Sequence, residues 1–135
     1  MAWSFTSRAP VYMQIVSRIR ADILGGVYQP DQQIPAVRQL ALTAGVNPNT
    51  MQRAFSVLEA EQLFITRGTI GRFITTDTEV LKRAREVMRR ETVARLIEEA
   101  AAVGISPAEL IESIRAYESE NAAEKGEASQ ETDTQ

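Results

Sequence analysis

The sequence predicts a mainly α fold with a small β-hairpin, in which three helices and the hairpin precede two longer helices. Three observations predict this fold. Apolar residues recur at helical spacing in three segments before residue 62, and two short apolar segments then flank a glycine-containing turn. Helical spacing of apolar residues resumes after residue 77. Because three helices followed by a hairpin form a winged helix-turn-helix, the chain divides into that domain at residues 1–76 and a helical region.

The first two helices are predicted at residues 10–24 and 35–44. The first has a buried face of Val11, Ile15, Ile19 and Ile23, and Gly25 ends it. The second has a proline, Pro35, in its first turn, and Arg38 lies early in it, off the apolar face. Gly45 ends the second helix. Since few residues separate it from the next helix, the pair forms a helix-turn-helix.

The third helix begins with Asn47, whose side-chain oxygen can cap it, and Pro48, which suits the first helical position. Its buried stripe consists of Met51, Ala54, Phe55 and Leu58. Four polar side chains lie off that stripe near the start: Asn49, Thr50, Gln52 and Arg53. Such groups at the start of a helix read base edges and phosphates in the major groove of DNA. A plain amphipathic helix explains the apolar stripe equally well.

The hairpin consists of strands at residues 63–66 and 72–75 with a turn at residues 67–71. Glycine in the turn allows close backbone approach, and the arginines Arg67 and Arg72 can reach a minor groove or phosphate. A hairpin with two surface arginines and no DNA contact is the alternative. We therefore predict these DNA-binding residues: Arg38, Asn47, Asn49, Thr50, Gln52, Arg53, Arg67, Gly68, Thr69 and Arg72.

Charge and composition narrow the function. The net charge is −3, but residues 1–76 carry seven arginines against four carboxylates, a balance of +3, and the remainder carries −6. A basic first half favours a nucleic-acid partner for that half, although a solvated mixed surface would look the same. The absence of cysteine and histidine removes common metal ligands and catalytic groups, so we expect no cofactor, metal site or catalytic residue. No segment has the length and hydrophobicity of a membrane span, and the first residues lack the apolar core of a signal peptide. We expect a cytoplasmic location.

Residues 77–120 are predicted to form two helices with apolar stripes, the first about 25 residues long and ending at Gly104. Ser106 and Glu109 have capping-box spacing at the start of the second. Two such helices need a surface to pack on, and we favour a second copy of the chain over the chain's own domain. The predicted dimerisation residues are Val80, Ala84, Val87, Met88, Ile97, Leu110, Ile111 and Ile114. Residues 121–135 are expected to be a disordered acidic tail.

Residues 8–76 resemble the winged-helix domain of GntR-family transcription regulators. The resemblance rests on five motifs in order, at residues 10–15, 34–41, 45–50, 58–61 and 71–74. The two-helix tail resembles the YtrA subfamily, whose members lack a large effector domain, dimerise through this tail and commonly repress operons that include membrane transport systems. The resemblance implies DNA contacts for Arg38 and for the start of the third helix. Gln52 stands where many relatives have a base-reading arginine, and Arg53 follows it.

Several positions depart from the family pattern. Pro48 replaces an arginine of some relatives, and Ala36 replaces the usual serine or threonine, so a hydroxyl that could cap the second helix is missing. Gln62 replaces the usual glycine after the third helix, where we expect a left-handed backbone at a cost of about 1 kcal/mol. Gly68 falls one residue early, which leaves Thr69 in the position of the first wing glycine.

These observations favour a homodimeric, sequence-specific DNA-binding regulator, most simply a repressor acting on an inverted-repeat operator, over two other classes of function. A winged helix used as a protein-interaction module would fit the acidic net charge. An enzyme is disfavoured by the absence of histidine and cysteine. An effector could bind between the tail helices of a dimer, or regulation could depend on expression level, and no residue distinguishes these two.

Overall fold

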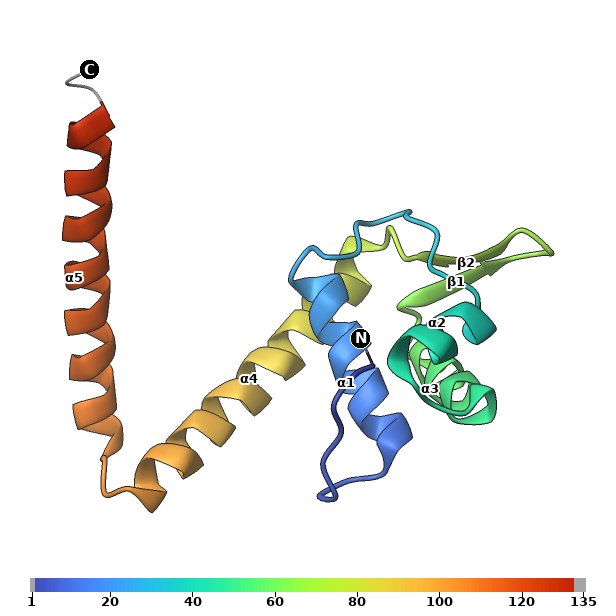
Figure 1. The fold of residues 1–135 in the computed structure, drawn as a ribbon, viewed down its shortest axis with the longest axis horizontal. Helices are drawn as coiled ribbons and strands as arrows, with labels where there is room; N and C mark the ends of the chain where they lie inside the picture. The colour runs from blue at the N-terminus through green and yellow to red at the C-terminus, as the bar shows by residue number, and fades with distance from the viewer. Residues whose placement is uncertain (1, 133–135) are drawn as a thin grey trace. The chain divides into compact units, whose positions relative to one another are not determined.

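The computed structural model describes residues 2–132, with the side chains of residues 2–126 among them. The elements follow the order α1 (Val11–Leu24), α2 (Val37–Ala44), α3 (Pro48–Ala60), β1 (Phe64–Arg67), β2 (Gly71–Ile74), α4 (Thr78–Ala102) and α5 (Pro107–Thr132) (Figure 1). The predicted mainly α fold with a hairpin wing is confirmed. The chain divides into two compact units, residues 1–88 and 89–135, which are described separately below.

The core of the first unit lies among α1, α2 and α3. Ile15 and Ile19 of α1 and Met51 and Phe55 of α3 are almost completely buried, and the ring of Phe64 meets that of Phe55 edge to face at 5.1 Å between centroids. Aromatic pairs prefer this arrangement. Of the predicted inward face of α1, Val11 is the exception, because it lies at the exposed first turn of the helix.

The turn between α2 and α3 has the tight geometry that the sequence predicts. Gly45 ends α2 in the left-handed conformation, with φ of 74°, and the N–H of Val46 donates to the carbonyl of Ala41. Helix α2 begins at Val37, after Ala36 at its N-cap. Pro35 therefore lies outside the helix, not in its first turn as expected. The residue before a helix takes an extended backbone, and Ala36 does so here.

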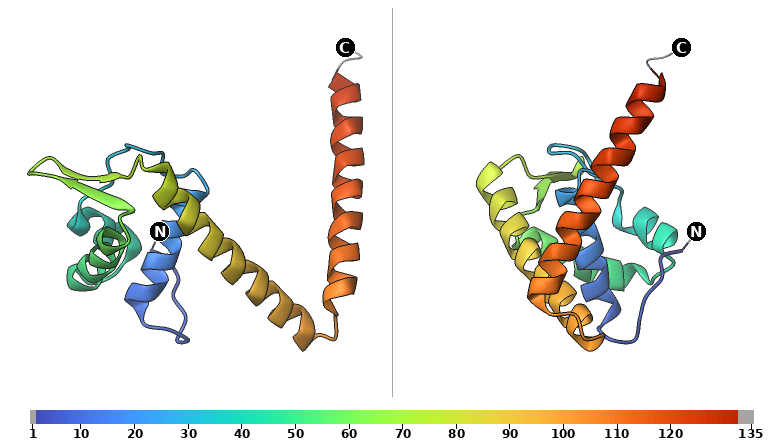
Figure 2. Two further views of the ribbon diagram at one scale, coloured as in Figure 1. Left: turned by 180° about the vertical axis from the view of Figure 1, so that it is seen from behind. Right: turned by 90° about the vertical axis from the view of Figure 1, so that its left-hand side faces the viewer.

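The hairpin is an antiparallel pair in which Phe64 lies opposite Ile74 and Arg67 opposite Gly71. Residues 31–34 extend this sheet, since the N–H groups of Asp31 and Ile34 donate to the carbonyls of Ile74 and Arg72. The hairpin projects away from the three helices in the views of Figures 1 and 2. The chain after α1, which the sequence pattern marked only as a connector, thus covers the outer edge of β2.

Helix α4 begins on the first unit. The carboxylate of Asp77 accepts hydrogen bonds from the N–H groups of Glu79 and Val80, which caps the helix. Val80 is buried in the core, and Leu81 and Ala84 pack against it. The first two turns of α4 therefore close the apolar side of the winged domain.

The second unit contains the end of α4 and all of α5. Gly104 follows α4 with φ of 79°, and the hydroxyl of Ser106 accepts a hydrogen bond from the N–H of Glu109 at 3.2 Å, as the predicted cap requires. Helix α5 continues to Thr132, well past the predicted end near residue 120. Alanine and glutamate are frequent there, and their helix propensity explains a helix where an unstructured tail was expected. The expectation for residues 133–135 falls outside the described residues.

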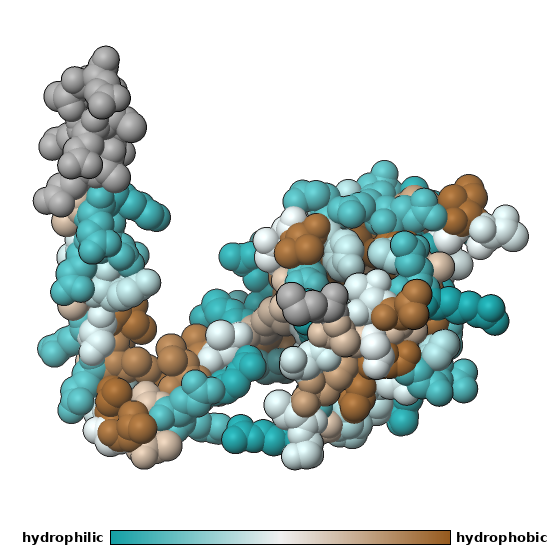
Figure 3. Space-filling view, viewed as in Figure 1, coloured by the Kyte–Doolittle hydropathy of each residue, from teal (hydrophilic) through white to brown (hydrophobic). Residues whose placement is uncertain are grey.

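Apolar side chains of the second unit remain exposed. They gather around the turn between α4 and α5 and along α5 (Figure 3), where Val103 is 73% exposed and Tyr117 is 68% exposed. None of the helices within the described residues has the length and apolar character needed to cross a membrane.

Candidate DNA-binding surface

The start of α3 presents polar side chains on a fixed backbone. The side-chain oxygen of Asn47 accepts a hydrogen bond of 2.8 Å from the N–H of Asn49, and Pro48 occupies the first helical position. Asn47 thus fulfils the predicted capping role, and its oxygen is used by the protein's own backbone. Met51, Ala54, Phe55 and Leu58 anchor the opposite face of α3 in the core. The orientation of the exposed face is therefore set by buried apolar packing.

The four predicted reading residues differ in their surroundings. Asn49, Gln52 and Arg53 are exposed and Thr50 is half-buried. The amide of Gln52 is 3.4 Å from the hydroxyl of Ser56, one turn further along the helix. The guanidinium of Arg53 lies 3.9 Å from the centre of the Tyr12 ring. All four residues lie in the first two turns of α3, as their spacing predicts.

Arg38 lies in the first turn of α2 and is exposed. Among the described residues, no hydrogen bond or ion pair engages its guanidinium. A planar guanidinium with free N–H donors is suited to a phosphate of the DNA backbone. Arg38 is therefore a predicted DNA-contacting arginine that has no polar partner among the described residues.

Both wing arginines are already paired. Arg67 forms an ion pair with Asp31, and its guanidinium lies 4.4 Å from the centre of the Phe73 ring. Arg72 pairs with Glu59 of α3, and its side chain is only 25% exposed. The guanidinium of Arg72 thus joins the wing to α3, and its contact with DNA stays a prediction. The sequence offered no signal for this pair, which connects residues on different elements.

The tip of the wing carries the remaining predicted contacts. Gly68 has φ of 51° and a Cβ built there would meet no atom within 4 Å, and Thr69 is exposed. The side-chain amide of Gln33 donates to the carbonyl of Ile70 at 2.8 Å, and Ile70 is 69% exposed. Gln33 therefore anchors one side of the turn by a hydrogen bond, while the other side of the turn is exposed to solvent. Gln33 and Ile70 were not among the predicted site residues.

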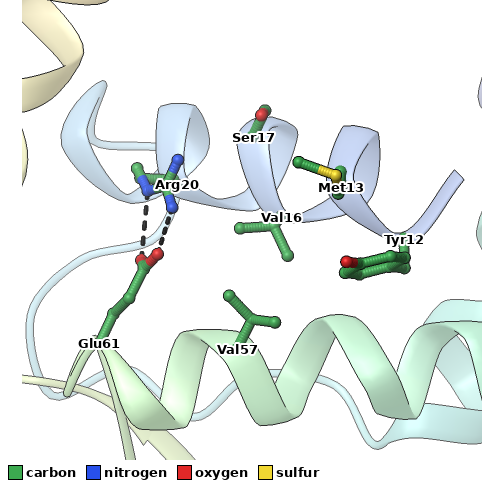
Figure 4. A pocket seen from close by; sticks show the side chains of 7 residues that line it. All are labelled: Tyr12, Met13, Val16, Ser17, Arg20, Val57 and Glu61. Carbon is green, nitrogen blue, oxygen red and sulfur yellow. Dashed lines mark hydrogen bonds and ion pairs between the residues drawn. The ribbon is translucent and has the colours of Figure 1, made fainter. Parts of the chain in front are cut away.

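A shallow groove of about 240 Å³ runs between α1 and α3 (Figure 4). Val16 and Val57 form its apolar floor, and Tyr12 lies at the end where α1 starts. The ion pair between Arg20 and Glu61 lies at the other end and joins α1 to the end of α3. Within the described residues, no group of three potential ligands is arranged to hold a metal ion.

The predicted dimerisation residues fall into two sets. Val80 is buried in the first unit's core and Ala84 packs against that core, so their apolar surface is used within the chain. The prediction placed both in an interface between copies, and the structure instead packs them onto the domain they follow. The other residues are exposed or half-buried in their own units: Val87, Met88, Ile97, Leu110, Ile111 and Ile114.

Comparisons with known proteins agree with this geometry. The family described as "Bacterial regulatory proteins, gntR family" matches residues 11–74, which contain the helix-turn-helix and the hairpin. The HTH-type transcriptional repressor YtrA of Bacillus subtilis is 31% identical over 110 residues, which cover 81% of this chain and 85% of that protein. The chain belongs to the GntR family. GntR-family members are DNA-binding transcription regulators and not enzymes.

Solved structures extend the similarity of this GntR-family chain to its tail. A GntR family transcriptional regulator from Listeria monocytogenes has a TM-score of 0.72 at 28% identity, with 83% of this chain and 98% of that chain covered. AraR(DBD) in complex with operator ORX1 has a TM-score of 0.50 at 26% identity, with 56% of this chain and 99% of that chain covered. The winged domain therefore has a counterpart that has been seen on operator DNA.

Proposed function

We propose that this GntR-family chain is a homodimeric repressor that reads an inverted-repeat operator. The observation that carries the proposal is the start of α3. There the Asn47 cap and the buried stripe of the helix hold Asn49, Gln52 and Arg53 on an exposed face. A helix presented in this way fits the major groove of one half-site. Arg38 and the wing tip would contact phosphates and set the register, and the three α3 side chains would read bases.

The proposal of a dimer rests on the apolar surface of α4 and α5. Val93, Ile97, Ile111, Ile114 and Tyr117 are large apolar residues, each exposed by more than a third. A contiguous apolar surface on a regulator marks an interaction site. A two-fold partner is the simplest occupant, because the two halves of an inverted repeat mirror a symmetric protein.

Repression, as opposed to activation, is proposed from the similarity to the repressor YtrA. The subfamily resemblance further suggests an operon that includes a membrane transporter. The location we propose is the cytoplasm, where a regulator would meet chromosomal DNA.

The test is to incubate the purified chain with fragmented genomic DNA of its source at physiological ionic strength and to sequence the retained fragments. We expect enrichment of a short inverted repeat whose half-sites are about one helical turn apart. Absence of any enriched motif would refute sequence-specific binding by the protein alone. The same duplexes then serve as probes for the variants described below.

The oligomeric state is tested separately by sedimentation of the full chain. Ile114→Glu places a charge on the apolar face of α5 and should shift the protein to the monomer and weaken operator binding. Ala116→Glu, at an exposed position about half a turn round the helix from Ile114, is the matched control because it adds the same charge on the opposite side of α5. Equal effects of the two variants, or a wild-type monomer, would contradict the proposed interface.

A winged helix used for protein interaction is the second candidate, favoured by the net charge of −3. The salt dependence of DNA affinity separates the two functions. Neutralised phosphates release counterions, so a DNA-reading domain loses affinity steeply as salt rises. A slope near zero would favour the interaction module.

A further inference from the structure

The starts of α1 and α3 meet at a hollow of about 380 Å³, lined by Val11, Tyr12, Asn49, Thr50 and Arg53. Two of these residues belong to α1, which the sequence pattern marked only as a scaffold. The other three belong to the exposed start of α3. The recognition surface therefore includes one end of α1, and the contact between the two helices there involves a charged side chain.

That contact is a stack of a cation on an aromatic ring. The guanidinium of Arg53 lies 3.9 Å from the centre of the Tyr12 ring. Arg53 is exposed and Tyr12 is half-buried. The ring is attached to a rigid support, because Ile15 and Val16 in the next turn of α1 are buried in the core. The Tyr12 ring thus restrains the guanidinium of Arg53, and α1 in turn holds the ring in place.

The stack restricts Arg53 without using its hydrogen-bond donors. A ring contacts the face of a guanidinium, whereas the N–H groups lie in its plane and stay available at the edges. A free arginine side chain has many rotamers and loses them when it binds. If the ring removes part of this freedom beforehand, the entropy loss on binding DNA is smaller. Asn49 lies one helical turn before Arg53 and shares its face of α3.

We infer that Tyr12 is a positioning residue for DNA recognition, which holds the Arg53 guanidinium beside Asn49 and Thr50 in the orientation that meets DNA. This inference rests on the proposed function. Tyr12 acts through Arg53 and does not itself read a base. The alternative is that the stack only helps to pack α1 against α3, in which case its removal would lower stability without a specific effect on binding.

The test is a double-mutant cycle measured on the inverted-repeat duplex that the wild-type protein retains. The variants are Tyr12→Leu, Arg53→Gln and both together, with thermal unfolding of each recorded and binding measured well below every midpoint. Tyr12→Phe keeps the ring and should bind like the wild type. Tyr12→Leu should weaken binding by roughly twofold to fivefold for each half-site, because the Arg53 side chain would then lose its rotamer freedom only when it binds DNA.

The decisive result is non-additivity. If Tyr12 works through Arg53, the double variant should bind no more weakly than Arg53→Gln alone. Arg18→Gln is the matched control, because Arg18 stacks on Trp3 at 4.0 Å and this stack does not include α3. Arg18→Gln should leave operator affinity unchanged.

Three outcomes would overturn the inference. Additive effects would mean that Tyr12 and Arg53 act independently, and unchanged affinity in Tyr12→Leu would mean that the ring has no part in binding. A decrease in Tyr12→Phe equal to that in Tyr12→Leu would assign the effect to the hydroxyl. In all three cases wild-type binding to the operator persists, so the proposed function survives. If the wild type itself retains no specific duplex, the proposed function fails and the inference fails with it.

Discussion

The Nε of Arg72 donates a hydrogen bond to the Glu59 carboxylate, which connects strand β2 to the last turn of α3. The same carboxylate is 3.4 Å from the hydroxyl of Thr66 on β1. The guanidinium of Arg72 also lies 5.3 Å from the centre of the Phe55 ring. One acidic residue of α3 thus contacts both strands of the wing. This pair therefore links α3 to the wing, the two elements proposed to contact DNA.

Glu59→Gln removes the charge of this joint at nearly constant side-chain volume. Because the two side chains are 25% and 33% exposed, the pair lies between a surface and a buried ion pair, and we expect the free energy of unfolding to fall by about 1 kcal/mol. Urea unfolding followed by circular dichroism measures it. Glu112→Gln on exposed α5 is the control and should cost almost nothing. Equal values for the two variants would show that the joint contributes no stability.

Arg38 and Gln52 should separate affinity from specificity. Arg38→Ala is expected to weaken binding to all duplexes and to lower the salt slope by about one for each phosphate that is no longer neutralised. Gln52→Ala is expected to relax sequence preference at one position of each half-site, because Gln52 is proposed to meet a base and not a phosphate. Affinities for a set of single-base operator variants distinguish the two. Unchanged affinity of Arg38→Ala at physiological salt would refute the proposed docking.

The missing hydroxyl at the start of α2 can be restored. Ala36 is the N-cap of α2 and no side chain caps that helix, whereas Asn47 caps α3. Ala36→Ser should raise the free energy of unfolding by about 1 kcal/mol, and Asn47→Ala should lower it by a similar amount. The two variants should change the free energy of unfolding in opposite directions, so each serves as the control for the other in urea titrations. Lower stability in Ala36→Ser would mean that the hydroxyl cannot reach the first turn.

The sequence was sufficient for features set by neighbouring residues. Asn47 before Pro48 predicted a capped helix start, and the hydrogen bond to Asn49 confirms the cap. The family resemblance, which has a glycine at the position of Gln62, predicted a left-handed backbone there, and the φ of 65° agrees. These predictions succeed because caps and turns depend on local backbone geometry.

Features that join distant parts of the chain could not be predicted in this way. The pairing of Arg72 with Glu59 and the stacking of Arg53 on Tyr12 require the relative placement of separate elements. The same holds for Val80, whose apolar character fits an interface or the chain's own core equally well. Hydrophobic periodicity shows which face of a helix is buried and does not show what covers it.

Gln62 offers a stabilising substitution. A residue with a Cβ is strained in the left-handed region, and glycine is not. Gln62→Gly should therefore raise the free energy of unfolding by about 1 kcal/mol, less the extra entropy that glycine gives the unfolded chain. Gly45→Ala is the opposite control, since its φ is 74° and a Cβ would lie 2.8 Å from the Cβ of Ala2. Destabilisation by Gln62→Gly would mean that the side chain makes an interaction worth more than the strain.

The carboxyl of Asp22 predicts a dependence of stability on acidity. Burial raises the pKa of Asp22 above its ordinary value of 3.8, and the nearby charge of Arg18 lowers it by less. The folded state therefore keeps this proton to a higher pH than the unfolded state does. The folded state binds more protons in that interval, so the Asp22 contribution to stability is present below about pH 3.8 and is lost as pH rises through the folded-state pKa.

Asp22→Asn should remove this contribution, so that the free energy of unfolding falls less than in the wild type as pH rises from the acid range towards neutrality. Tyr28→Phe is the control. Burial, and after it the charge of Asp22, raises the pKa of Tyr28 above 10.0, so the phenol stays protonated throughout the acid range. Tyr28→Phe can change the level of stability but should leave its acid slope unaltered. Parallel pH profiles of Asp22→Asn and the wild type, from urea unfolding at a series of pH values, would show that the Asp22 carboxyl titrates alike in the folded and unfolded states.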